Sequence, residues 1–146
     1  MSDKVLLDTN ILVYLYDSFE PSKQERAITV VDALIQRASA VISPQIMGEF
    51  FMATTRANRP LLTPIEALGR IRNYLSTCQV VELTGLITLE AVRGVETHQF
   101  QYGDAQIWAT ARLNQITEIY SEDFNAGAIV EGVRFTNPLA DEFQCC

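Results

Sequence analysis

The chain has 146 residues and a formal net charge of −7, with 48% hydrophobic and 20% charged residues. This length and composition indicate one folded domain with a sizeable core and exclude a disordered chain. The sequence has no apolar stretch long enough to span a membrane and no signal-peptide pattern at its N-terminus, so we expect no membrane association. Three cysteines, two of them adjacent at the C-terminus, make no disulfide framework, and we expect a cytoplasmic protein.

Short apolar runs alternate along the chain with stretches whose apolar residues recur at helical spacing. In chain order, the pattern predicts a strand at 5–7, helices at 10–16 and 21–37, a strand at 40–42, helices at 43–58 and 63–74, a strand at 79–83, helices at 88–98 and 104–114, and strands at 118–121 and 133–135. Asn10 is the expected N-cap of the first helix, and the run from Thr63 to Glu66 is a capping box. The alternation predicts a single α/β domain over residues 1–146 with a mostly parallel sheet.

Four acidic residues lie where such a sheet would place a site. Asp8 directly follows the first strand, and Asp123 comes just after the fourth. Asp104 heads the buried face of its helix, with apolar residues at i+3, i+4 and i+7, and Glu49 lies at the edge of the apolar stripe of another helix. Because ligands bind at the carboxyl ends of the strands in open α/β sheets, we expect these four side chains to converge there.

Each of the four acids also has an ordinary structural interpretation. Asp8 and Asp104 could cap helices, Glu49 could be a solvated edge residue, and Asp123 could belong to a turn. Taken singly, these interpretations are reasonable. The joint position of all four acids favours a shared site.

Carboxylates this close together cannot all stay ionised without a counter-charge. The nearest basic residues are Lys4, at the far end of the first strand, and Arg56, two turns beyond Glu49. An all-oxygen donor set favours Mg²⁺ or Mn²⁺, whereas a single histidine, His98, and the lack of paired-cysteine spacing disfavour zinc. Bound metal would also change the local sign of charge in a chain whose net charge disfavours nucleic-acid binding.

The sequence resembles the PIN domain family, and within it the small stand-alone proteins similar to VapC-type toxins. The motifs that carry this resemblance occur in the family's order and are VLLDTNILVY, SPQIMGEFF, FQYGDAQIWATARL and IYSEDFNAG…GVRFTNP. The resemblance implies a three-layer α/β/α PIN-like fold with a central, mostly parallel sheet flanked by helices. It also implies a metal-dependent endoribonuclease, the toxin of a type II toxin–antitoxin pair, whose catalytic and metal-binding acids are Asp8, Glu49, Asp104 and Asp123.

The resemblance extends to other residues and to partners. Asn10 and Ser121 match polar residues that line the same pocket, and Glu122 is the alternative to Asp123 as the fourth acid. The implied partners are RNA, an antitoxin protein that covers the site and a second copy of the chain in a homodimer. The tail ADEFQCC departs from the family pattern, and we interpret Cys145 and Cys146 as a frayed terminus.

Four carboxylates can hold one or two Mg²⁺ (or Mn²⁺) ions, which would activate a water toward a phosphodiester and stabilise the departing 3′ oxygen. We assign direct metal contact to Asp8 and Asp104, and a second ion or the orientation of the water to Glu49 and Asp123. Candidate RNA contacts on one rim of the groove are Arg56 and Arg59, with Arg70, Arg72 and Arg93 on another.

Two other functions use the same residues differently. A phosphatase of the haloacid dehalogenase class would use Asp8 as its nucleophile, but it needs a second Asp where this chain has Asn10, and a later Lys. The second alternative is a catalytically silent PIN-fold interaction module. The apolar residues Met47, Phe51 and the pair at 61–62 could serve a partner contact, although core packing is the simpler role.

Overall fold

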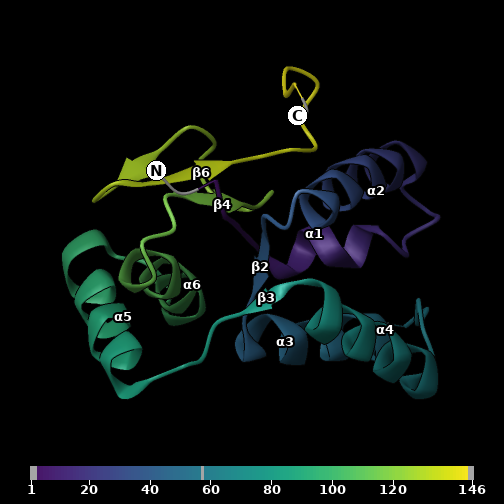
Figure 1. Ribbon diagram of the computed structural model, residues 1–146, viewed down its shortest axis with the longest axis horizontal. Helices are drawn as coiled ribbons and strands as arrows, with labels where there is room; N and C mark the ends of the chain where they lie inside the picture. Colours follow the sequence, from purple (N-terminus) through teal and green to yellow (C-terminus); the bar gives the residue numbers. More distant parts are fainter. Residues whose placement is uncertain (1–2, 57, 145–146) are drawn as a thin grey trace.

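A six-stranded sheet runs through the centre of the computed structural model, which describes residues 3–56 and 58–144 (Figure 1). The strand order is β3-β2-β1-β4-β6-β5, and every neighbouring pair is parallel except β5–β6. The strands are β1 (Val5–Leu7), β2 (Ala40–Ile42), β3 (Gln79–Val80), β4 (Glu118–Tyr120), β5 (Ile129–Val130) and β6 (Val133–Thr136). All residues of β1 and β2 are buried, as expected for parallel strands covered on both faces.

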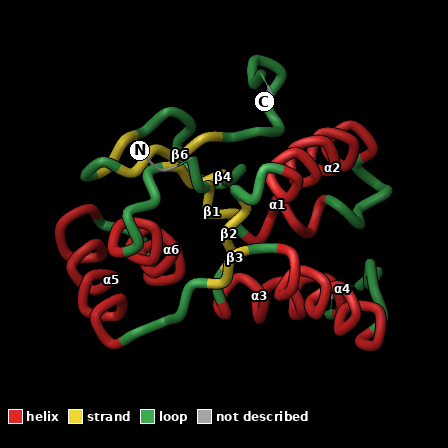
Figure 2. Tube along the Cα trace, viewed as in Figure 1, coloured by secondary structure: helices red, strands yellow, loops and turns green. Residues whose placement is uncertain are grey.

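Helices cover both faces of this sheet. They are α1 (Thr9–Tyr14), α2 (Pro21–Gln36), α3 (Pro44–Thr55), α4 (Pro64–Thr77), α5 (Gly85–His98) and α6 (Tyr102–Leu113). Helices α5 and α6 pack together on one side, and α1 to α4 lie on the other (Figures 1 and 2). The predicted three-layer α/β/α fold with a mostly parallel sheet is therefore confirmed.

Local capping explains most of the helix starts. The hydroxyl of Ser43 accepts a hydrogen bond from Ile46 N at 3.4 Å, and the capping box of Thr63 and Glu66 forms as predicted. The prediction of Asn10 as an N-cap was wrong, because α1 begins at Thr9 and Asp8 caps it. Helix α5 begins at Gly85 instead of residue 88, and β3 ends at Val80 instead of residue 83.

The hairpin of β5 and β6 contains the strand that the sequence pattern did not predict. Its two-residue turn is Glu131-Gly132, with φ of 48° and 85°. Both φ values are positive, as in the type I′ turns that join hairpin strands, and glycine favours such backbone. The Glu-Gly pair between two apolar stretches could have indicated a hairpin turn. The strand before it was missed because β5 is only two residues long.

A group of ion pairs joins this hairpin to α5 and α6, and we call it the ion-pair cluster: Glu90, Arg93, His98, Arg112 and Glu131. Arg93 bonds Glu90 at 2.8 Å and Glu131 at 2.9 Å, and Arg112 bonds Glu90 at 2.6 Å. The hydrogen bonds from Arg93 and His98 lower the pKa of Glu131 to about 2. Each carboxylate of this cluster thus has a guanidinium partner.

Beneath the ion-pair cluster, α5 and α6 meet at Gly94 and Trp108. The Trp108 ring is fully buried, and its indole N–H donates to the carbonyl of Val130 at 3.1 Å. A Cβ atom at Gly94 would lie 2.8 Å from the Trp108 ring, so only glycine permits this close approach of the helices.

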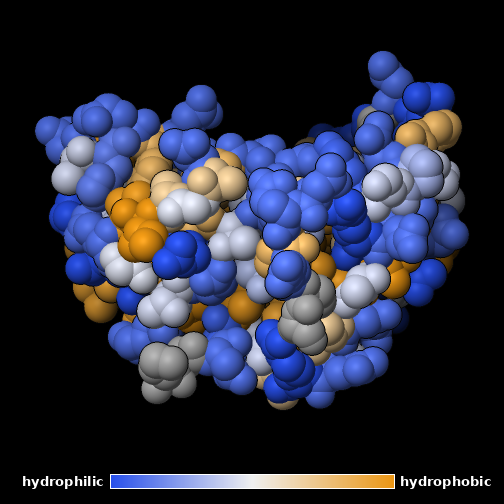
Figure 3. Space-filling view, turned by 90° about the horizontal axis from the view of Figure 1, so that it is seen from above, coloured by the Kyte–Doolittle hydropathy of each residue, from blue (hydrophilic) through white to orange (hydrophobic). Residues whose placement is uncertain are grey.

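Apolar side chains fill the space between the layers. Met47 and Leu62 belong to the core, and Phe51 is half-buried against it, so core packing accounts for these residues of the predicted partner surface. Seen from the side of β6 and α2, the surface is mostly hydrophilic with smaller apolar patches (Figure 3). No described helix has the length and apolar character needed to cross a membrane. The predicted frayed terminus at Cys145 and Cys146 lies outside the described residues.

Candidate active site

Asp8 and Ser121 lie side by side at the carboxyl ends of the two central strands. Strands β1 and β4 are parallel, with Leu7 paired to Tyr120, so the next residue of each strand reaches the same edge of the sheet. The hydroxyl of Ser121 donates to Asp8 Oδ2 at 2.6 Å, and the backbone N–H of Thr9 donates to Asp8 Oδ1 at 2.7 Å. Asp8 is both the N-cap of α1 and a member of the candidate site, so its structural and functional interpretations are compatible.

Burial makes the charge on Asp8 costly. The side chain is only 5% exposed, and removal from water is the main cause that raises its pKa from 3.8 to about 6. The hydrogen bonds from Ser121 and Thr9 oppose this rise, and the negative charges of Asp123 and Glu49 add to it. Asp8 is therefore close enough to both carboxylates to be affected by their charge.

Glu49 reaches this edge from α3 and is held by two donors. The hydroxyl of Thr9 donates to Glu49 Oε1 at 2.9 Å, and the side-chain amide of Gln45 donates to Oε2 at 3.1 Å. The same amide donates to the carbonyl of Gly103 at 3.0 Å, next to Asp104. Gln45 thus ties α3 to the start of α6, a role that sequence reasoning did not identify, although Gln45 lies four residues before Glu49 on the same helix.

Asp104 lies in the first turn of α6, as predicted, and it is half-buried. Burial raises its pKa, and the charges of Asp123 and Glu49 raise it further. The same two carboxylates therefore raise the pKa of Asp8 and of Asp104. The charges of Glu49 and Asp123 thus act on both Asp8 and Asp104, and we call these four residues the acidic cluster.

The loop after β4 distinguishes Asp123 from Glu122. The Glu122 carboxylate accepts a hydrogen bond from the Tyr14 hydroxyl at 2.6 Å and pairs with Lys23 at 2.6 Å. Burial alone would raise the pKa of Glu122, but the bonds from Lys23 and Tyr14 outweigh it and lower the pKa. Asp123 instead is exposed and acts on Asp8 and Asp104. The geometry favours Asp123 as the fourth acid.

Asn10 and Ser121 hold this loop against α1. Asn10 Nδ2 donates to Ser121 Oγ at 3.4 Å, and Asn10 Oδ1 accepts from the backbone N–H of Glu122 at 3.3 Å. The N–H of Asp123 also donates to Ser121 Oγ at 3.1 Å. Both supporting polar residues predicted from the sequence thus lie at the acidic cluster, and they set the position of its loop.

The arginines predicted to contact RNA have different surroundings in the structure. Arg56 is exposed at the C-cap of α3, and Arg59 lies over the ring of Phe19, with its guanidinium carbon 4.0 Å from the ring centre. Arg93 belongs to the ion-pair cluster, so the second predicted rim loses this member.

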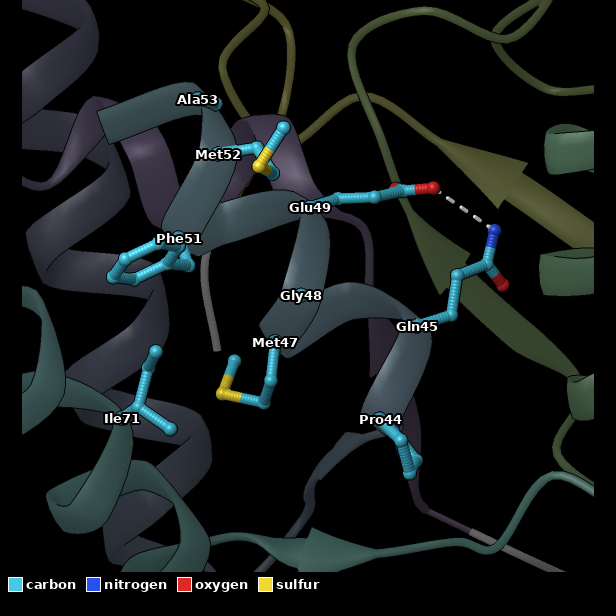
Figure 4. Close-up of a pocket in the computed structure, with 9 residues that line it drawn as sticks. All are labelled: Pro44, Gln45, Met47, Gly48, Glu49, Phe51, Met52, Ala53 and Ile71. Carbon is cyan, nitrogen blue, oxygen red and sulfur yellow. Dashed lines mark hydrogen bonds between the residues drawn. The ribbon is translucent and has the colours of Figure 1, made fainter. Parts of the chain in front are cut away.

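An apolar hollow of about 990 Å³ lies next to Glu49, along α3 and Ile71 of α4 (Figure 4). In Figure 4, Glu49 and its partner Gln45 point to one side of α3, away from Met47, Phe51 and Ile71. Glu49 and Gln45 also line the hollow, so the hollow and the acidic cluster adjoin at α3.

The acidic cluster has the donor chemistry of a magnesium or manganese site. Its side chains offer only carboxylate oxygens, and within residues 3–56 and 58–144 none of the four forms an ion pair with Lys, Arg or His. As they stand, no three acidic, histidine or cysteine side chains of the described chain are grouped closely enough to share one ion. A Mg²⁺ site does not need three of these side chains, because Mg²⁺ usually takes only one or two carboxylates and keeps several waters.

The fold and the site define a class of protein: a three-layer α/β domain with an acidic cluster at the carboxyl ends of its central parallel strands. The sequence profile of the PIN domain family matches residues 5–130, which is most of the chain. The protein belongs to the PIN domain family.

Solved structures share this fold over nearly their whole length. A toxin–antitoxin complex from Klebsiella pneumoniae has a chain of 23% identity and a TM-score of 0.69, covering 92% of this chain and 98% of that one. VapC20 of Mycobacterium tuberculosis, described as a toxin that cleaves the sarcin–ricin loop, has 18% identity and a TM-score of 0.65, with 90% and 99% covered. DNA-bound VapBC of Salmonella typhimurium has 15% identity and a TM-score of 0.66, with 94% and 99% covered. Compared with curated protein sequences, the chain has no match.

Proposed function

We propose that the protein is a metal-dependent endoribonuclease that hydrolyses phosphodiester bonds in RNA. The observation that carries this proposal is the acidic cluster: the charges of Glu49 and Asp123 act on both Asp8 and Asp104, and none of the four acids forms an ion pair with a basic side chain among the described residues. Selection for stability alone would not favour such mutual repulsion, whereas a bound cation would use it. Membership of the PIN domain family supports the same activity.

In this proposal Asp8 and Asp104 bind a Mg²⁺ or Mn²⁺ ion directly, and Glu49 and Asp123 bind a second ion or orient the attacking water. When bound, the metal supplies an activated water and stabilises negative charge on the phosphodiester. The protein itself fixes the ligands. Ser121 holds one oxygen of Asp8, while Thr9 and Gln45 hold the two oxygens of Glu49. Such supporting hydrogen bonds orient metal ligands in proteins generally.

We further propose that the protein is the toxin of a type II toxin–antitoxin pair and works in the cytoplasm, where its RNA substrate is found. Its structural neighbours include chains from toxin–antitoxin complexes. An antitoxin would cover the acidic cluster, and a second copy would form a homodimer through exposed apolar helix surface. Leu86 and Leu89 of α5, 70% and 69% exposed, and Ile65 of α4, 82% exposed, supply such surface.

The test is cleavage of total RNA by the purified protein with Mg²⁺ or Mn²⁺, and again with EDTA. The proposal predicts metal-dependent cleavage that leaves a 5′ phosphate and a 3′ hydroxyl. Asp8→Asn keeps the size of the side chain and removes a metal-binding oxygen, and it should abolish this cleavage. Cleavage that persists in EDTA, or undiminished cleavage by Asp8→Asn, would contradict the assignment.

A further inference from the structure

A groove leads away from the acidic cluster along α1. One hollow of about 360 Å³ is lined by Thr9 and Asp123 at the cluster, and a second of about 470 Å³ is lined by Phe19 and Arg59. The two hollows share Val13, Asp17 and Ala53 as lining residues. They are therefore neighbours, and together they form one surface path from Asp123 to Arg59.

Phe19 stands at the far end of this path, and the turn after α1 keeps it outside the core. The carboxylate of Asp17 accepts the backbone N–H of Phe19 at 3.1 Å, and the carbonyl of Asp17 accepts the N–H of Glu20 at 3.2 Å. The Phe19 side chain is 56% exposed. Because the Phe19 ring is exposed, it contributes little hydrophobic free energy to folding. Contact with a ligand would explain its exposure, whereas core packing does not.

The planar guanidinium group of Arg59 lies over this ring. Its guanidinium carbon lies 4.0 Å from the centre of the Phe19 ring, within the range of a cation–π contact. Aromatic rings and arginine planes are the surfaces on which unpaired bases of single-stranded RNA stack. We call these two side chains the Phe19–Arg59 pair.

The other charges of the hollow select a base rather than a phosphate. Asp17 and Glu20 line it beside Arg59, so the hollow has more negative than positive side chains. A phosphate would be repelled there, whereas a base is neutral, and its amino groups can donate to carboxylates. A base in a duplex is already stacked and paired, so an unpaired base is the better fit.

We infer that the Phe19–Arg59 pair stacks one unpaired base of a single-stranded RNA segment that also reaches the acidic cluster, while the phosphates beside this base stay outside the hollow. This inference rests on the proposed function for the nature of the chain that is bound. It makes Phe19 a determinant of substrate binding that touches the substrate away from the reacting phosphodiester. Its removal should weaken binding and leave the chemical step unchanged.

The test measures binding of a fluorescein-labelled, single-stranded oligoribonucleotide by anisotropy, in Mg²⁺, with Asp8→Asn as the parent protein. Adding Phe19→Leu should weaken binding about tenfold, since stacking on one aromatic ring contributes this much or more. Adding Phe19→Tyr should preserve binding because the ring remains. The matched control is Ile129→Ala on β5, an apolar residue 57% exposed that does not line the groove. A paired RNA duplex of the same sequence should show no dependence on Phe19.

Cleavage by the wild-type protein separates the two proposals. If the wild type cleaves RNA but Phe19→Leu binds the single strand as tightly as its parent, only this inference is overturned, and the groove is then better suited to a protein segment. If the wild type does not cleave but binding depends on Phe19, the inference holds and the proposed catalysis fails. If neither the wild type nor Asp8→Asn binds RNA, both proposals are overturned.

Discussion

The acidic cluster and the ion-pair cluster both contain carboxylates, but in opposite electrostatic surroundings. In the ion-pair cluster, the hydrogen bond from Arg93 is the main cause that lowers the pKa of both Glu90 and Glu131. In the acidic cluster, burial and neighbouring carboxylates raise the pKa of Asp8 and Asp104. The first arrangement joins a hairpin to two helices, and its charges are balanced within the chain. The second leaves negative charge unbalanced, which is typical of a site completed by a ligand.

The largest expected difference between the two clusters is in catalysis. Asp104→Asn should lower RNA cleavage more than about 100-fold, since even the loss of groups that only orient metal ligands costs about 10–100-fold. The matched variant Glu90→Gln, in the ion-pair cluster, should retain nearly full activity per folded molecule. Both are measured as initial rates in Mg²⁺. Equal losses in the two variants would remove the distinction between the clusters.

Removing the charge of Asp8 should stabilise the metal-free protein, although it should abolish cleavage. Because the pKa of Asp8 rises from 3.8 to about 6 on folding, ionised Asp8 opposes folding: the unfavourable contribution is absent below pH 3.8 and grows until about pH 6. At about 1.4 kcal/mol per pKa unit, ionised Asp8 lowers the free energy of unfolding by about 3 kcal/mol. The gain in the variant is smaller than this, because the amide of the variant accepts weaker hydrogen bonds from Ser121 and Thr9 than the carboxylate does. Asp8→Asn in EDTA should therefore be more stable than the wild type near neutral pH.

Urea unfolding at several pH values checks this prediction. The advantage of Asp8→Asn should disappear as the pH falls toward 3.8, where Asp8 becomes protonated in both states. Added Mg²⁺ should stabilise the wild type and narrow the gap, because a ligand that binds only the folded state stabilises it. A variant that is less stable than the wild type in EDTA at neutral pH would show that Asp8 has a purely structural role.

Near the ion-pair cluster, the packing of α5 against α6 should affect the free energy of unfolding without affecting cleavage. Gly94→Ala places a Cβ atom 2.8 Å from Trp108 Cζ3, so α5 and α6 must separate or the ring must move. We expect a loss of about 1–3 kcal/mol in the free energy of unfolding, as for other overpacked cores. Cleavage per folded molecule should change little. The near-neutral control is Gly69→Ala on α4, where an added Cβ has nothing within 4 Å. If the two variants unfold alike, the close contact at Trp108 is not limiting.

The smallest expected effect concerns Gln45, which touches the acidic cluster but carries no charge. Gln45→Leu removes the donors to Glu49 and to the carbonyl of Gly103. Cleavage should fall about tenfold through a misplaced Glu49, at the lower end of the effects of such supporting groups. Gln45→Glu would add a fifth negative charge and should be worse. If Gln45→Leu cleaves RNA at the wild-type rate, Glu49 is positioned without Gln45.

The parts of the fold that the sequence predicted are those set by local patterns. The strands at 5–7 and 40–42 were predicted correctly because their apolar runs are buried on both faces. Ser121 was expected near Asp8 only through the family resemblance, and the parallel pairing of β1 and β4 explains why the two side chains meet. Strand β5 was missed because two residues carry no period.

What the sequence could not give were contacts between distant side chains. Thr9 bonds Glu49 across 40 positions of the chain, and no local pattern encodes that contact. The choice between Glu122 and Asp123 depends on Lys23, a residue of α2 that engages Glu122 from outside the motif. The cap of α1 was misassigned because Asp8 serves the helix and the acidic cluster at once.

Direct binding of Mn²⁺, measured by the loss of the free-ion signal in electron paramagnetic resonance, tests the central claim that the acidic cluster holds a cation. The account predicts saturable binding by the wild type, greatly weakened binding by Asp8→Asn and Asp104→Asn, and unchanged binding by Glu90→Gln. Binding that survives both aspartate substitutions, or no saturable binding by the wild type, would contradict it.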